Sequence, residues 1–202
     1  MGLSFHYKGT IRSLHLIDEM TEEVKDICKS LNWDYHIWEK KETKRRYKSK
    51  SQAVISQPTP EDVKGISISP PECEILFLTF LPNGDLCSPI KLIYYDPATN
   101  DIMIEMIHTK TQFAGPDTHI ALMELLRYLK GKYFAKLEVD DEGMYWGKWD
   151  KKILYSQFSK YNVLLDIVAD ALSDFKVKPG ETTGSLADRL EKFLREKLSG
   201  KK

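Results

Sequence analysis

The stretch from Cys73 to Tyr95 constrains the fold of this chain more than any other. It reads CEILFLTFLPNGDLCSPIKLIYY, two apolar runs that meet at Pro82-Asn83-Gly84-Asp85. Because Asn-Gly supplies the positive φ angles that a tight hairpin turn requires, we expect two long strands joined there. Every residue from Ile75 to Leu81 except Thr79 is apolar, which indicates a strand with both faces buried inside a sheet.

The remaining patterns predict an α+β fold, in which helices lie mainly on one face of a mostly antiparallel sheet centred on the 73–95 hairpin. Alternating or apolar runs predict further strands at Leu3 to Thr10, Trp33 to Trp38, Val63 to Ser69, Ile102 to His108, Phe134 to Val139 and Met144 to Trp149. Apolar residues at three- and four-residue steps predict a helix from Ser13 to Asn32, one from Thr118 to Lys130 closed by Gly131, and two C-terminal helices, Ile153 to Phe175 and one capped by Ser185.

A strand-helix-strand pattern occurs twice, in Leu3 to Trp38 and in Ile102 to Val139. Residue identity between the two is weak, so the alternatives are a duplicated unit and a coincidence. An antiparallel sheet with helices on one side resembles in shape the saddle of TATA-binding-protein-like folds. The basic character of a DNA-binding saddle is absent here, and a shared fold implies no function.

Length and composition favour one domain over residues 1–202, since 202 residues with 42% hydrophobic content can bury a full core. A charged stretch at about 39–62 is expected to form an exposed loop, and residues 199–202 to fray. Thirty basic residues balance thirty acidic ones, so the net charge of zero provides no general attraction to nucleic acid or to a membrane. The basic cluster Lys44 to Lys48 is expected to be part of the solvated loop.

The cysteines and the first residues indicate a cytoplasmic location. The chain has three cysteines, Cys28, Cys73 and Cys87, an odd number, and they lie in apolar surroundings. This favours free thiols in a reducing compartment. The opening MGLSFHYKG lacks the charged and apolar regions of a secretory signal. A membrane-spanning helix requires an apolar run of about 18 residues, and no run in this sequence approaches that length. We therefore expect no membrane association.

The segment from His108 to His119 is the first candidate ligand site. It leads from a predicted strand to a helix N-terminus, where free backbone N–H groups and the helix dipole favour an anion. The side chains that could add donors are His108, Lys110, Thr111, Thr118 and His119. The alternative is an ordinary helix entry in which Pro116 sets the backbone and Asp117 or Thr118 caps the helix.

The second candidate is the sheet face that points away from the helices. Strand alternation places there His6, His36 and Trp38, and Glu105 as a further member, together with the charged residues Lys8, Asp34, Lys136 and Glu138. Such a face could hold a small ligand, or its polar residues could simply keep it soluble. No short-range spacing brings these side chains into one coordination sphere, so we expect no metal site.

No motif in the sequence points to catalysis. Cys73 lies between two glutamates, which disfavours a thiolate, and there is no Gly-x-Ser-x-Gly or phosphate-binding glycine motif. We therefore assign no catalytic residue and no cofactor. The aromatic residues Tyr145, Trp146 and Trp149 could form a protein contact or pack under the following helix.

These observations favour a binding or protein-interaction module without catalytic activity. The alternative is an enzyme or binding protein that acts on a small anionic or phosphorylated ligand at the 108–119 segment. The two expectations differ in the surface they require: convergent polar groups in a pocket near His108 for a ligand, or a flat apolar patch near Tyr145 for a protein partner.

Overall fold

The computed structural model of this protein describes residues 2–39, 59–94, 107–176 and 180–199. The chain divides into two compact units, Met1–Leu154 and Tyr155–Lys202, which are described separately. Most of the predicted loop at about 39–62, namely residues 40–58 with the Lys44 to Lys48 cluster, lies outside the described residues. Residues 95–106 also lie outside them; they include the end of the predicted hairpin and most of the strand predicted after it. Of the tail, residues 200–202 also lie outside them.

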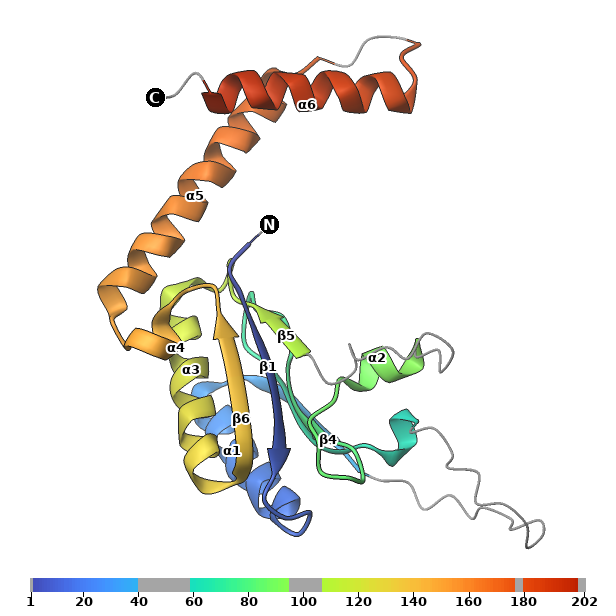
Figure 1. The fold of residues 1–202 in the computed structure, drawn as a ribbon, viewed down its shortest axis with the longest axis vertical. Coiled ribbons are helices and arrows are strands. Elements are labelled where there is room, and N and C mark those ends of the chain that lie inside the picture. Colours follow the sequence, from blue (N-terminus) through green and yellow to red (C-terminus); the bar gives the residue numbers. More distant parts are fainter. Residues whose placement is uncertain (1, 40–58, 95–106, 177–179, 200–202) are drawn as a thin grey trace, which may run out of the picture. The chain divides into compact units, whose positions relative to one another are not determined.

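Two three-stranded antiparallel sheets form the first unit. In one sheet, β1 (Ser4–Ile11) lies between β5 (Ile107–Lys110) and β6 (Phe134–Asp141), as Figure 1 shows. In the other, β3 (Lys64–Ser69) lies between β2 (Asp34–Trp38) and β4 (Leu76–Phe80). The strands predicted at Val63 to Ser69 and Phe134 to Val139 are therefore confirmed.

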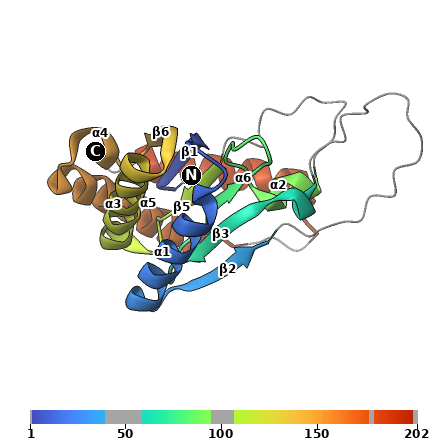
Figure 2. The same ribbon diagram turned by 90° about the horizontal axis from the view of Figure 1, so that it is seen from below.

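Helices cover the sheets. The helix α1 (Leu16–Leu31) contacts β2 and β3, which Figure 2 shows beside it, and α3 (Gly115–Lys132) contacts β6. Shorter helical segments are η1 (Pro60–Asp62), α2 (Pro89–Ile93) and α4 (Tyr145–Lys148). The core includes Phe5, Tyr7, Met20, Val24, Ile66, Ile68, Leu76, Leu78, Phe80, Leu122, Leu126 and Leu129. The α+β class is confirmed.

The strand β4 is buried at every position, as its apolar sequence predicts. Its turn differs from the expected one, because Gly84 has φ +91° while Asn83 is not among the described residues with positive φ. The Gly84 N–H donates to the Leu81 carbonyl at 2.9 Å, and the Leu81 N–H donates to the Asp85 carbonyl at 2.9 Å. This is the three-residue hairpin loop in which glycine takes the left-handed position after an ordinary turn.

The residues after the turn join the two sheets. The Leu86 N–H donates to the Gly9 carbonyl of β1 at 2.8 Å, while the Cys87 N–H donates to the Thr79 carbonyl of β4 at 2.9 Å. The segment 84–87 thus bonds to both sheets in turn. At the opposite end of β4, the Tyr7 hydroxyl accepts from the Phe77 N–H at 2.8 Å and donates to the Phe77 carbonyl at 3.0 Å, which provides a second link between the sheets.

The prediction that the second strand of the hairpin continues beyond Cys87 is wrong. The chain leaves the sheet at Ser88, whose hydroxyl accepts the Lys91 N–H at 3.4 Å, and α2 begins at Pro89. Proline is favoured at the first helical position because its missing N–H would have no partner there. Leu92 of α2 packs with Val63, Leu81 and Cys87, so its apolar side chain serves helix packing rather than a strand.

Two helix boundaries also differ from the prediction. The side chain of Arg12 donates to the carbonyls of Gly131 at 2.9 Å, Lys132 at 3.2 Å and Phe134 at 3.0 Å. Because the bonds to Gly131 and Lys132 satisfy the last carbonyls of α3, the helix continues through Gly131 to Lys132, while the third bond holds the start of β6. At the other boundary, the Leu16 N–H donates to the Ser13 carbonyl at 3.0 Å, and α1 starts at Leu16 without a side-chain cap from Ser13. Its predicted end is confirmed, because Asn32 has φ 53°.

The predicted edge strand from Met144 to Trp149 is a short helix instead. The Asp141 carboxylate accepts the backbone N–H groups of Gly143 at 2.7 Å, Tyr145 at 2.7 Å and Trp146 at 2.9 Å, which winds the chain around it. β6 has already ended at Asp141, and Met144 takes a left-handed φ of 59° as the N-cap residue of α4.

The second unit contains most of α5 (Lys151–Asp174) and α6 (Thr183–Ser199). The two predicted C-terminal helices are confirmed, although Thr182 rather than Ser185 caps the last one, since its carbonyl accepts the Leu186 N–H at 2.9 Å. Arg189 of α6 pairs with Glu181 at 2.7 Å and lies 4.3 Å from the centre of the Phe175 ring. No helix within the described ranges is both long and apolar enough to cross a membrane.

Tyr7→Phe tests the link between the sheets. Removing the hydroxyl leaves the buried N–H and carbonyl of Phe77 without this partner, so we expect the free energy of unfolding to fall by about 1–3 kcal/mol. Urea unfolding followed by circular dichroism measures it. Tyr94→Phe is the matched control because Tyr94 is 82% exposed, and equal stability of the two variants would contradict the role of the Tyr7 hydroxyl.

Candidate ligand-binding pocket

A pocket of about 350 Å³ lies where the approach to β4, the start of α2 and the start of β5 meet. Its lining residues are Cys73, Glu74, Ile75, Phe77, Ser88, Ile90, Lys91, Ile107 and His108. The volume falls at the lower end of the range of about 300–1,000 Å³ that is usual for small-molecule sites.

Hydrogen bonds hold the segment before β4 against β5 on one side of the pocket. The Glu74 N–H donates to the Lys110 carbonyl at 3.0 Å, and the Glu74 carboxylate accepts the Lys110 N–H at 3.0 Å. The Thr109 hydroxyl donates to the Ile75 carbonyl at 3.1 Å. This side of the pocket is therefore fixed to β5 by one backbone and two side-chain hydrogen bonds.

The pocket walls are apolar. Phe77 and Ile107 are buried, while Ile90 of α2 remains 45% exposed at its rim. Ile75 is half-buried between them. These four side chains provide an apolar surface of the kind that buries the body of a small ligand.

Polar groups occupy the edge of the pocket. His108 Nε2 lies 3.8 Å from a carboxylate oxygen of Glu74, and both side chains are about half exposed. Lys91 adds an ammonium group from α2. Together these three side chains offer hydrogen-bond donors and an acceptor beside the apolar walls.

Two lining residues could in principle act as nucleophiles, but neither is activated. Burial and, to a smaller extent, the adjacent Glu74 carboxylate raise the pKa of the Cys73 thiol to about 12, so the thiol is neutral near pH 7. The Ser88 hydroxyl already accepts the Lys91 N–H as the N-cap of α2. The pocket can bind a molecule, but its own groups are poorly suited to covalent catalysis.

The structure distributes the residues predicted for the 108–119 site over different surroundings. His108 and Lys110 alternate with Thr109 along β5, so only the first two point away from the core. His108 lines the pocket, whereas the Lys110 ammonium lies 5.2 Å from the centre of the Phe113 ring. Thr118 is half-buried in the first turns of α3, which starts at Gly115 rather than Thr118 and has no side-chain cap.

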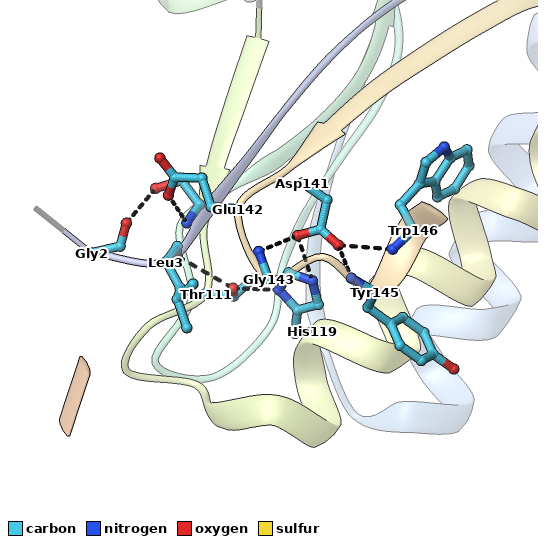
Figure 3. A network of polar contacts seen from close by, with 10 residues as sticks. Gly2, Leu3, Thr111, His119, Asp141, Glu142, Gly143, Tyr145 and Trp146 are labelled. Carbon is cyan, nitrogen blue, oxygen red and sulfur yellow. Dashed lines mark hydrogen bonds and ion pairs between the residues drawn. The ribbon is translucent and has the colours of Figure 1, made fainter. Parts of the chain in front are cut away.

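Thr111 and His119 point into the protein, where both are fully buried. The Thr111 hydroxyl lies 2.8 Å from His119 Nδ1, and His119 Nε2 lies 3.1 Å from the Asp141 carboxylate, as Figure 3 shows. This network ties the end of β5, the start of α3 and the end of β6 together. Its position in the core makes it a structural connection between elements.

Asp141 stays ionised in this buried network. Burial alone would raise its pKa, but the His119 imidazole and the N–H groups of Trp146 and Gly143 hold the pKa of Asp141 below its usual value. The carboxylate side chain is only 2% exposed, so these partners replace the water that it loses on folding.

The predicted sheet-face residues separate into two groups. His6 is the register partner of His108, and their ring centres are 5.7 Å apart, so His6 lies beside the pocket residue. His36 and Trp38 contact each other on β2, where the Trp38 indole N–H donates to the Ser67 hydroxyl at 3.0 Å. Glu105 lies outside the described residues.

Neighbouring strands do bring charges together on β1 and β6. Lys8 is the register partner of Glu138, and their charged atoms are 3.2 Å apart; Lys136 approaches the same carboxylate at 2.6 Å. These pairs are exposed to solvent, where such contacts contribute little stability.

The aromatic group at Tyr145, Trp146 and Trp149 is partly covered within its own unit. Arg127 lies 4.4 Å from the centre of a Trp149 ring, and Lys130 lies 5.5 Å from a Trp146 ring. Tyr145 itself is buried. The cations of α3 thus occupy ring faces that a partner would otherwise contact.

Sequence reasoning missed the residues that α2 contributes to the pocket, Ser88, Ile90 and Lys91. The signal was present in the pair Ser88-Pro89, a preferred N-cap followed by a preferred first helical residue. The apolar run that follows favoured a strand, and this hid the helix start. Ile75 and Phe77 were predicted as buried strand residues, not as pocket walls.

Asp141→Asn tests the buried network. The amide accepts weaker hydrogen bonds than the carboxylate, so we expect the free energy of unfolding to fall by about 2 kcal/mol at neutral pH. Because the folded-state pKa of Asp141 is lowered, its contribution is present above the unfolded pKa of about 4 and is lost as the pH falls through the folded pKa.

Urea unfolding across this pH range should therefore show the two proteins converging in acid. The adjacent, exposed Asp140→Asn is the control and should match the original protein throughout. A stability difference for Asp141→Asn that stays constant on acidification would contradict this account.

Comparison with known proteins adds no functional information. No protein-family model, no curated protein and no solved structure matches the chain. Within the described ranges, no group of three or more His, Cys, Asp or Glu side chains is placed to hold a metal ion. The pocket between β4, α2 and β5 is therefore the feature on which a functional proposal rests.

Proposed function

We propose that this protein is a binding module that holds a small amphipathic molecule in the pocket between β4, α2 and β5. The supporting observation is the cavity of about 350 Å³ with Ile75, Phe77, Ile90 and Ile107 around it. A ligand that buries an apolar body against these walls gains about 0.8 kcal/mol for each CH₂ group.

The charged end of the ligand is an anion in this proposal, which takes up the anionic ligand of the alternative interpretation of the sequence. Lys91 offers an ammonium group and His108 an imidazole at the pocket edge. A carboxylate can accept hydrogen bonds from both. Glu74 beside His108 disfavours a highly charged group such as a phosphate, which selects for a single negative charge.

The side chains that line the pocket support binding without catalysis. The Cys73 thiol is held neutral and the Ser88 hydroxyl serves as a helix cap. We place the protein in the cytoplasm, because Cys28, Cys73 and Cys87 are all free, as a reducing compartment would keep them.

Ile90→Asp and Ile93→Asp form a matched pair for testing the pocket. Both residues are exposed on α2, at 45% and 64%, but only Ile90 lines the pocket. The probe is the fluorescence of 8-anilinonaphthalene-1-sulfonate, displaced by straight-chain carboxylates from butanoate to dodecanoate. We expect Ile90→Asp to weaken binding at least about tenfold, by placing a charge against the apolar ligand, and Ile93→Asp to leave it unchanged.

Displacement should strengthen by about fourfold for each added CH₂ until the pocket is full. Lys91→Met should weaken binding of the carboxylate but not of the alcohol of the same length. Binding that is equal in the two aspartate variants, or that ignores chain length, would refute the pocket as the binding site.

A further inference from the structure

The middle of α5 presents an apolar surface that its own unit does not cover. Val163 is 54% exposed, Leu164 48%, Leu165 40% and Leu172 46%. Ordinary monomeric proteins seldom leave several large apolar side chains exposed along one helix. This surface is independent of the pocket and of the function proposed for it.

Two of these side chains, Leu165 and Leu172, belong to a regular seam. Apolar residues recur at alternating steps of three and four, the pattern of helices that pair along their length: Phe158, Tyr161, Leu165, Val168, Leu172 and Phe175. The ends of this seam are covered, because Phe158 is buried and the Phe175 ring lies 5.4 Å from that of Phe193. Leu165 and Leu172, between those ends, remain open to a partner.

The positions that flank the seam carry no charge. They include Asn162, Leu164 and Ala169. Like charges at these flanking positions are the usual means by which helices avoid pairing with copies of themselves. Their absence permits close approach of an identical helix.

The charges of α5 are segregated along its length. Its first half carries Lys151, Lys152 and Lys160 and no acidic residue, whereas its second half carries Asp166, Asp170 and Asp174 and no basic residue. This order is unfavourable for the helix's own dipole, which prefers acidic residues first and basic residues last. It is complementary to the same helix running in the opposite direction.

We propose that α5 pairs antiparallel with α5 of a second copy of this chain, across a two-fold axis. In this arrangement Leu165 of each copy packs beside Val168 of the other, and Tyr161 packs beside Leu172. The lysine half of each helix then lies along the aspartate half of its partner, with Lys160 at the level of Asp174. An anionic membrane fits this surface poorly, because its lipids would repel the three aspartates.

Sedimentation velocity of the full chain tests the pairing. The protein should be a dimer, Leu165→Glu should be a monomer, and Val163→Glu should remain a dimer. Val163 is the matched control because it is exposed on the same helix but lies on the side away from the seam. Circular dichroism of Leu165→Glu should match the original protein, since Leu165 is partly exposed and its replacement leaves the core unchanged.

Charge exchange tests the direction of pairing. Lys160→Asp and Asp174→Lys should each raise the dimer Kd by about threefold to tenfold, because each places like charges together twice in the symmetric dimer. The double variant restores opposite charges and should recover the original Kd. In a parallel dimer each residue would face its own copy, so neither single exchange would weaken pairing.

Three results would overturn the proposal. The first is a monomer at every concentration, and the second is equal dissociation of the Leu165→Glu and Val163→Glu variants. The third is a monomeric chain that co-sediments with phosphatidylcholine and phosphatidylserine vesicles and loses this binding on Leu165→Glu, because that result would assign the surface to a membrane.

Discussion

The two sheets of the first unit depend on one stretch of chain that bonds to both. The strand β4 is buried along its whole length, and the segment 84–87 that follows its turn donates hydrogen bonds to β1 and to β4. The Tyr7 hydroxyl makes a second link at Phe77. Because a buried backbone polar group must find a partner, these bonds fix the position of one sheet against the other. The two helices α1 and α3 then cover a framework that is already joined.

The pocket follows from the way the chain leaves this framework. After Cys87 the backbone can no longer continue as a strand, since Ser88 and Pro89 start a helix. The helix turns Ile90 and Lys91 back towards Phe77 and Ile107, and a cavity remains between them. One wall residue of the pocket, Phe77, also takes part in the link between the sheets, so a ligand would meet a preformed surface with little ordering cost.

Features with a local cause could be predicted from the sequence, and those with a distant cause could not. Asn32 ends α1 in the left-handed conformation that its side chain tolerates, and the apolar run of β4 is buried as expected. By contrast, α3 continues through Gly131 because Arg12 satisfies its last carbonyls, and α4 forms because Asp141 gathers three N–H groups. No short-range pattern reveals such partners. The candidate site was predicted in part for the same reason: His108 lies at the pocket, but Lys110, Thr111, Thr118 and His119 do not line it.

Residue polarity did not predict solvent exposure at the 108–119 segment or along α5. Thr111 and His119 are polar and were predicted at a ligand site, yet both are fully buried, where Asp141 and the backbone replace water as their surroundings. Leu165 and Leu172 are apolar members of a predicted helix, yet both are exposed on α5. A buried polar group requires partners within the chain, and an exposed apolar seam requires one outside it. We therefore interpret Thr111 and His119 as connections within the chain. We interpret the exposed Leu165 and Leu172 as the surface of the proposed association with a second copy.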